Sequence, residues 1–141
     1  MRFMIIVKST PEFEAETTPQ TPDEALIKAM ADYHEQLSKA GVLLDASGLQ
    51  PSRKGWRIHY DGKKRTVTDG PFAEAKELIA GFTTIQVRNR EEAMEWSRRY
   101  PNPVGEGQPA VIEVRQLYEL DDFSPGEQID RIREMNTPSQ K

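Results

Sequence analysis

Residues 69–77 read DGPFAEAKE, and the rest of the fold can be interpreted outward from this stretch. It opens on Asp-Gly-Pro, which is typical of a tight turn because Asp caps turns with its own side chain and Pro fixes one backbone angle. Phe72 follows as an apolar anchor, and Glu74, Lys76 and Glu77 form a charged cluster behind it. We therefore expect a shaped loop that forms one wall of a cleft.

Strand patterns lie on both sides of this loop. Before it, apolar and polar side chains alternate over residues 56–60, which predicts a strand. The following Asp-Gly pair is typical of a two-residue hairpin turn, so residues 65–68 are expected to form the second strand of the hairpin. After it, residues 78–87 read as a core strand, in which Gly81 allows a bulge or a close backbone approach. The loop is thus expected to join a β-hairpin to a buried strand.

Two amphipathic helices are predicted elsewhere in the chain. Apolar residues recur at spacings of three and four over residues 26–40, with Thr21 as the expected cap and Gly41 as the end. The second helix begins at Asn89, which can cap it, and runs toward Tyr100. Each helix has one apolar stripe that must be buried.

The remaining segments complete an α+β order. Residues 3–7, 42–49 and 111–118 read as strands, and residues 9–22 read as a polar surface loop. Without the inserted β-hairpin, the order is the split β-α-β pattern of a ferredoxin-like sandwich. Its helices cover one sheet face, so the other face needs a partner, and a second copy would give a dimeric α/β barrel.

Length and composition restrict the class of protein. The 141 residues fit one domain, which we place at residues 1–118, with a C-terminal tail at 119–141 that is helical near 128–135 or disordered. The net charge of −4 and the absence of a basic stripe disfavour nucleic-acid binding. No apolar run approaches the roughly 18 residues of a membrane span. We expect a cytoplasmic homodimer.

Cysteine and histidine usage limits the chemistry further. The chain has no cysteine, which excludes disulfides and thiolate catalysis, and only two histidines, His34 and His59. No motif for a cofactor or a metal is visible, so none is expected. An imidazole titrates near neutral pH, which makes His34, at the edge of the first helical stripe, the leading candidate for acid–base chemistry. The alternative is a helix-edge histidine that only hydrogen-bonds a neighbour.

Other candidates have structural alternatives of equal or greater weight. Asp69 would orient His34 or accept a substrate proton, although a role in capping the turn is favoured. Arg115 would bind an anionic substrate bidentately or form a salt bridge with Glu113. We expect Phe72 to fill an apolar pocket at the substrate site, and Glu74 and Lys76 to contact substrate or to form a solvated face.

The loop also carries a family resemblance. Residues 68–77 followed by Gly81-Phe82 resemble the signature of the DGPF proteins within the YCII-related superfamily. Segments on both sides of the loop, among them the one at Tyr33-His34, also resemble that family, and the resemblance covers about residues 2–117. It implies a ferredoxin-like dimeric α/β barrel with an active-site cleft on each protomer and no established substrate.

The resemblance also implies two kinds of function. Related YCII-like proteins carry a His–Asp pair whose Asp lies just after the second helix, where this chain reads Arg99-Tyr100-Pro101 and has none. Family members are often encoded beside extracytoplasmic-function sigma factors. Two hypotheses follow. The first is an enzyme of lyase or isomerase type, with His34 as acid–base and Asp69 and Arg115 in support. The second is a non-catalytic ligand-sensing or regulatory dimer, with a sigma factor as a candidate partner.

Overall fold

The computed structural model describes residues 1–15 and 23–136. Its centre is a four-stranded antiparallel sheet in the order β2-β5-β1-β6. The strands are β1 (Arg2–Lys8), β2 (Leu43–Gly48), β5 (Ile79–Gln86) and β6 (Ile112–Gln116). This α+β order is consistent with the predicted ferredoxin-like sandwich.

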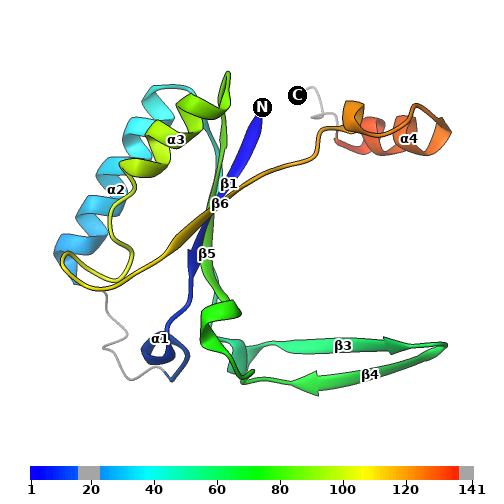
Figure 1. Ribbon diagram of the computed structural model, residues 1–141, viewed down its shortest axis with the longest axis horizontal. Coiled ribbons are helices and arrows are strands. Elements are labelled where there is room, and N and C mark those ends of the chain that lie inside the picture. Colours follow the sequence, from blue (N-terminus) through cyan, green and yellow to red (C-terminus); the bar gives the residue numbers. More distant parts are fainter. Residues whose placement is uncertain (16–22, 137–141) are drawn as a thin grey trace.

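Two helices, α2 (Glu24–Lys39) and α3 (Arg90–Arg98), cover one face of this sheet (Figure 1). Asp23 caps α2, and its side chain accepts a hydrogen bond from the Ala25 amide. The predicted cap, Thr21, lies outside the described residues, and the cap belongs to Asp23 because the helix starts at the next residue. Asn89 caps α3 as predicted, since its side chain accepts from the Glu92 amide at 2.9 Å.

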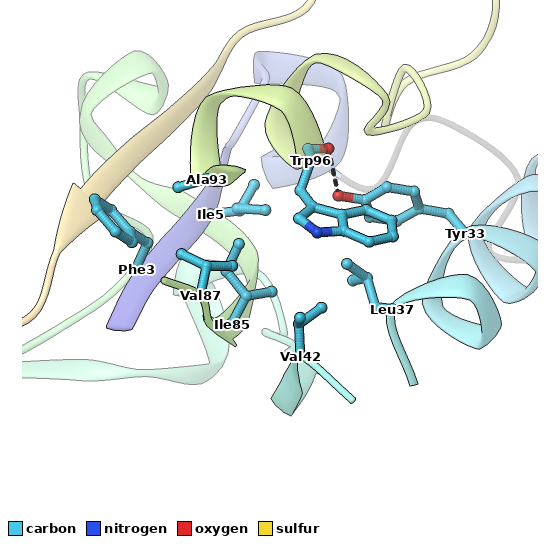
Figure 2. Close-up of a cluster of buried hydrophobic side chains, with 9 residues drawn as sticks. All are labelled: Phe3, Ile5, Tyr33, Leu37, Val42, Ile85, Val87, Ala93 and Trp96. Carbon is cyan, nitrogen blue, oxygen red and sulfur yellow. Dashed lines mark hydrogen bonds between the residues drawn. The ribbon is translucent and has the colours of Figure 1, made fainter. Parts of the chain in front are cut away.

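The core lies between these helices and the sheet (Figure 2). Alternate residues of the two central strands point toward the helices, and the helices contribute residues three or four apart, as amphipathic periodicity requires. The Tyr33 hydroxyl donates a hydrogen bond to the Trp96 carbonyl at 2.6 Å, which ties α2 to α3. The buried cluster consists of Phe3, Ile5, Tyr33, Leu37, Val42, Ile85, Val87, Ala93 and Trp96.

One predicted loop contains a helix. Residues 9–22 were expected to be a polar surface loop, but Pro11–Ala15 form the short helix α1 and Ser9 is buried. The prolines and glutamates that suggested a loop are also favourable in a first helical turn. There the N–H that Pro lacks has no partner within the helix, and negatively charged side chains interact favourably with the positive end of the helix dipole. The expectation of a loop was therefore wrong for Pro11–Ala15, and residues 16–22 lie outside the described part.

A two-stranded ribbon and a C-terminal helix project from the side of the sheet opposite α2 and α3, at its two ends (Figure 1). The ribbon consists of β3 (Trp56–Asp61) and β4 (Lys64–Asp69), preceded by the 3₁₀ turn η1 (Ser52–Lys54). Another turn, η2 (Ala75–Glu77), leads into β5. At the other end, η3 (Leu120–Asp122) leads to α4 (Glu127–Asn136). Among the described residues, no helix has the length and apolar character needed to cross a membrane.

We call the sheet surface opposite α2 and α3 the open face. Strand alternation places Met4 and Ile6 on it, because Phe3 and Ile5 point into the core. Phe82 pairs with Ile6 across the strands and shares that face. The open face thus has an apolar centre.

Candidate functional site

The loop that follows β4 is held by close backbone packing. A Cβ on Gly70 would overlap the backbone carbonyl of Ser52, so only glycine fits this position. The Gly70 amide donates to the Gly55 carbonyl at 3.0 Å, and the Gly70–Pro71 peptide bond is cis. Close packing against Ser52 therefore accounts for Gly70, in agreement with the predicted turn.

Ser52 and Glu14 anchor the next turn, although no pattern in the sequence indicated this role. The Phe72 amide donates to the Ser52 Oγ at 3.0 Å. Ser52 is in turn bound by the Glu14 carboxylate of α1, which accepts from its amide at 3.1 Å and from its hydroxyl. No local pattern identifies this contact, because Glu14 and Phe72 meet through a residue distant from both in the chain.

The remaining candidates of the loop are spread over its surface. The Arg57 guanidinium lies 3.9 Å from the centroid of the half-buried Phe72 ring, a cation–π contact. Glu74 adopts a left-handed backbone conformation with φ of 61°, and Lys76 is exposed in η2. The Asp69 carboxylate is exposed and accepts no hydrogen bond among the described residues, so other groups hold the turn that it was expected to cap.

His34 lies half-buried between α2 and β5, with both ring nitrogens engaged. Its Nδ1 is 2.7 Å from the Met30 carbonyl oxygen, and its Nε2 is 2.8 Å from the Thr83 Oγ1. A carbonyl only accepts, so the network assigns the proton of the neutral ring to Nδ1 and leaves Nε2 to accept from the Thr83 hydroxyl. Thr83 itself is almost completely buried, at 1% exposure.

Two tyrosines enclose this histidine. The Tyr33 and Tyr100 rings meet the imidazole edge-on, at centroid distances of 5.5 and 6.1 Å. Burial raises the pKa of the Tyr100 phenol, and a hydrogen bond with Thr83 offsets part of that shift. Burial also raises the pKa of Tyr33. The histidine therefore belongs to a partnered polar cluster at the margin of the core.

The predicted acid–base residues His34 and Asp69 are not hydrogen-bonded to each other. The hydrogen-bond partners of His34 are a carbonyl and a hydroxyl, and Asp69 is not among them. His34 borders neither the surface hollow between Arg2 and Arg133 nor the one between Asp32 and Lys39. In the described ranges, no group of three potential metal ligands gathers.

Comparison with known proteins assigns the family. A model of the YCII-related domain matches residues 1–121 of the chain. The chain belongs to the YCII-related domain family. The matched region contains the sheet, the helices that cover it, the ribbon and the loop at residues 69–77, and it ends before α4.

A relative in Rhizobium meliloti (strain 1021) is similar over part of the chain. It is described as uncharacterized protein R00369 and is 29% identical over 80 residues, which cover 57% of this chain. The aligned region spans 64% of the length of that relative.

On the open face of this YCII-related domain, β6 contributes a charged pair. Arg115 pairs with Met4 across the strands and Glu113 with Ile6, so both lie on the face away from the helices. The Arg115 Nη1 is 3.3 Å from the Glu113 Oε2, and the arginine side chain is 73% exposed. An ion pair this exposed contributes little to stability. Its guanidinium keeps donors available for another partner.

Proposed function

We propose that this YCII-related domain is a dimeric binding protein whose functional surface is the open face together with the ribbon and the C-terminal helix beside it. One observation carries the proposal. Large apolar side chains stand exposed on both projecting segments, among them Trp56 at 63% and Tyr60 at 68%. Exposed apolar surface of this extent marks an interaction site on a water-soluble domain.

The composition of the open face supports a protein partner. Its central strands carry the half-buried Met4 and Phe82 beside Ile6 and Thr84, which are buried, at 9% and 7% exposure, and its edge carries Glu113 and Arg115. An apolar centre within a charged rim is the usual anatomy of a protein interface. Pairing two such faces would give the dimeric α/β barrel, with the ribbon as an insertion between β2 and β5.

A small polar or anionic molecule is the ligand that this interface suits. Arg115 offers guanidinium donors on the open face, and its existing ion pair with Glu113 is weak enough to be exchanged. A ligand held there would be enclosed once a second copy covered the face. In this proposal, access to the ligand is shaped by the loop that follows the ribbon, with Phe72, Glu74 and Lys76.

The test combines self-association with ligand binding. Sedimentation velocity on the full chain should give a dimer. Succinate and phosphate, used as probe anions, should raise the melting temperature of the wild type and of the control Arg98→Gln, whose side chain is exposed on α3. The same anions should leave the melting temperature of Arg115→Gln unchanged. Equal shifts in all three proteins would overturn the role of Arg115, and a monomer would overturn the dimer.

A second candidate function is acid–base catalysis of lyase or isomerase type by His34. The observation that favours it is the hydrogen bond of Nδ1 to the Met30 carbonyl, which assigns a proton to Nδ1 and leaves Nε2 as the basic nitrogen. Because His59 is exposed on the ribbon, His59→Ala is a matched control. A metabolite that stabilises the wild type and His59→Ala but not His34→Ala would support catalysis at His34. Equal stabilisation of the three would exclude it.

The shape of the loop supports a finer family assignment. We infer that the chain is a DGPF protein within the YCII-related family, because residues 69–72 read Asp-Gly-Pro-Phe and Gly70 lies so close to the Ser52 backbone that only glycine fits there. The same resemblance gives an extracytoplasmic-function sigma factor as a candidate partner of a regulatory dimer. Unchanged sigma-factor output after deletion of the protein would contradict that partnership.

A further inference from the structure

Two segments flank the open face, and each leaves large apolar side chains exposed. We define the basic arm as residues 52–69, which form η1, β3 and β4, and the acidic arm as residues 118–136, which form η3 and α4. Both project on the same side of the sheet and from opposite ends of it (Figure 1). Whatever covers the open face must therefore also lie between the arms.

Each arm exposes apolar side chains that need a partner. On the basic arm, Ile58 and Val67 are paired across the ribbon and share one face with Trp56 and Tyr60. An isolated two-stranded ribbon is only marginally stable in water. A single helix as short as α4 is marginal as well, and α4 has no buried residue. Its exposed apolar residues are Ile132 and Met135, and Tyr118 and Phe123 precede it.

The arms carry opposite charge. The basic arm holds six Lys or Arg and two Asp, a net charge of +4. The acidic arm holds six Asp or Glu and two Arg, a net charge of −4. Its Glu127, Asp130 and Glu134 fall at intervals of three and four along α4 and therefore form one acidic stripe. The surface of one arm is thus complementary to that of the other, and not to itself.

A symmetric dimer can bring the arms together in two ways. A two-fold axis between the sheets and parallel to the strands would place basic arm on basic arm. An axis across the strands exchanges the two ends, so that each basic arm meets the acidic arm of the other copy. The first arrangement places like charges opposite one another, which opposes association. The second places oppositely charged surfaces together, and such complementarity favours one orientation and partner over others.

We infer that the open face binds a second copy of this chain in the orientation that packs the basic arm of each protomer against the acidic arm of the other. This inference rests on the homodimer proposed above and adds its orientation. It also assigns a role to α4, which lies beyond the family-matched region. The helix closes the interface on the partner's ribbon and stabilises both segments at once.

Crosslinking tests the orientation directly, because the chain has no native cysteine. Val67→Cys on the basic arm and Met135→Cys on the acidic arm replace exposed side chains, at 62% and 75%. In a mixture of the two variants, one of them tagged, a bismaleimide should link one chain to the other. Crosslinks confined to chains carrying the same substitution would overturn the inference.

Charge reversal gives an independent readout. Lys63→Glu/Lys64→Glu in the basic arm, or Asp130→Lys/Glu134→Lys in the acidic arm, should each weaken the homodimer by about tenfold or more, as like-charge contacts do. A chain that carries all four changes should regain most of the wild-type affinity. If neither pair of changes weakens the dimer, the arms do not meet. A wild-type monomer would refute the homodimer itself, whereas a dimer with crosslinks between like arms would refute only this orientation.

Discussion

Gly70 is the residue whose identity the structure explains most directly. Any side chain there would overlap the Ser52 carbonyl, which is backbone and cannot move aside without shifting η1. This agrees with the turn that the Asp-Gly-Pro sequence predicted, and it adds the surface against which the turn packs.

We expect Gly70→Ala to lower the free energy of unfolding by about 3 kcal/mol, the upper end for an overpacked site. Gly48→Ala is the control, because its Cβ would meet nothing within 4 Å and its backbone φ is not positive. Urea titration of the two variants measures the difference. Similar losses of unfolding free energy in both variants would show that the Ser52 backbone shifts to accommodate the added methyl group.

Tyr33 predicts a pH dependence. Burial raises its pKa above the usual value of 10.0, so above that pH the unfolded chain loses the phenolic proton while the folded chain keeps it. Stability is therefore complete below about pH 10 and falls as the pH rises toward the raised folded pKa.

Tyr33→Phe should make this alkaline loss shallower, although part of it remains because the pKa of Tyr100 is raised too. The variant should also lose about 1 kcal/mol at neutral pH, because the hydrogen bond from the Tyr33 hydroxyl to the Trp96 carbonyl is removed, while the Arg99 amide still donates to that carbonyl. Tyr118→Phe, at a position 75% exposed, should behave as the wild type. Urea titrations at pH 7 and pH 10.5 compare the three, and an unchanged alkaline slope in Tyr33→Phe would contradict the assignment.

Among the elements, the short helix α1 has an effect out of proportion to its length. Its Glu14 holds Ser52, and Ser52 holds the Phe72 amide, so three segments distant in the chain fix one loop. The sequence did not predict this helix, because five residues are too few for periodicity to show and tertiary contacts decide whether so short a helix forms.

Removing the Ser52 hydroxyl should loosen the loop locally. In Ser52→Ala the Phe72 amide loses its acceptor, and we expect its hydrogen exchange to speed up by about tenfold while core amides such as that of Ile85 keep their rates. NMR-detected exchange measures both. Ser124→Ala, at an exposed position, is the control, and an equal acceleration in the core would mean global destabilisation instead.

At the scale of the whole molecule, the opposite charges of the two arms make the proposed dimer sensitive to salt. Raising the NaCl concentration from about 0.05 to 0.5 M shortens the Debye length well below the spacing of surface charges. The wild-type dimer should weaken, whereas Lys63→Glu/Lys64→Glu should strengthen, because salt then screens a repulsion. Sedimentation equilibrium at the two salt concentrations checks the sign, and the same trend in both proteins would argue against contact between the arms.

The sequence by itself determined the succession of main elements. The spacing of apolar residues predicted α2 and α3, and the Asp-Gly pair predicted the ribbon. Gly81 marked a close backbone approach, because a Cβ at this position of β5 would lie only 3.0 Å from the Ser47 carbonyl oxygen. These features follow from local periodicity and backbone preference, which a few neighbouring residues specify. The edge position of His34 was predicted for the same reason.

Only the tertiary structure decided what the candidate residues touch. His34 meets Thr83 across 49 positions of sequence, and the loop at Phe72 meets Ser52 and α1. It also decided that His34 hydrogen-bonds Met30 and Thr83 and not Asp69, and that the two arms flank one open face. Such contacts depend on how the elements pack, because packing brings together residues whose separation in the chain carries no local signal.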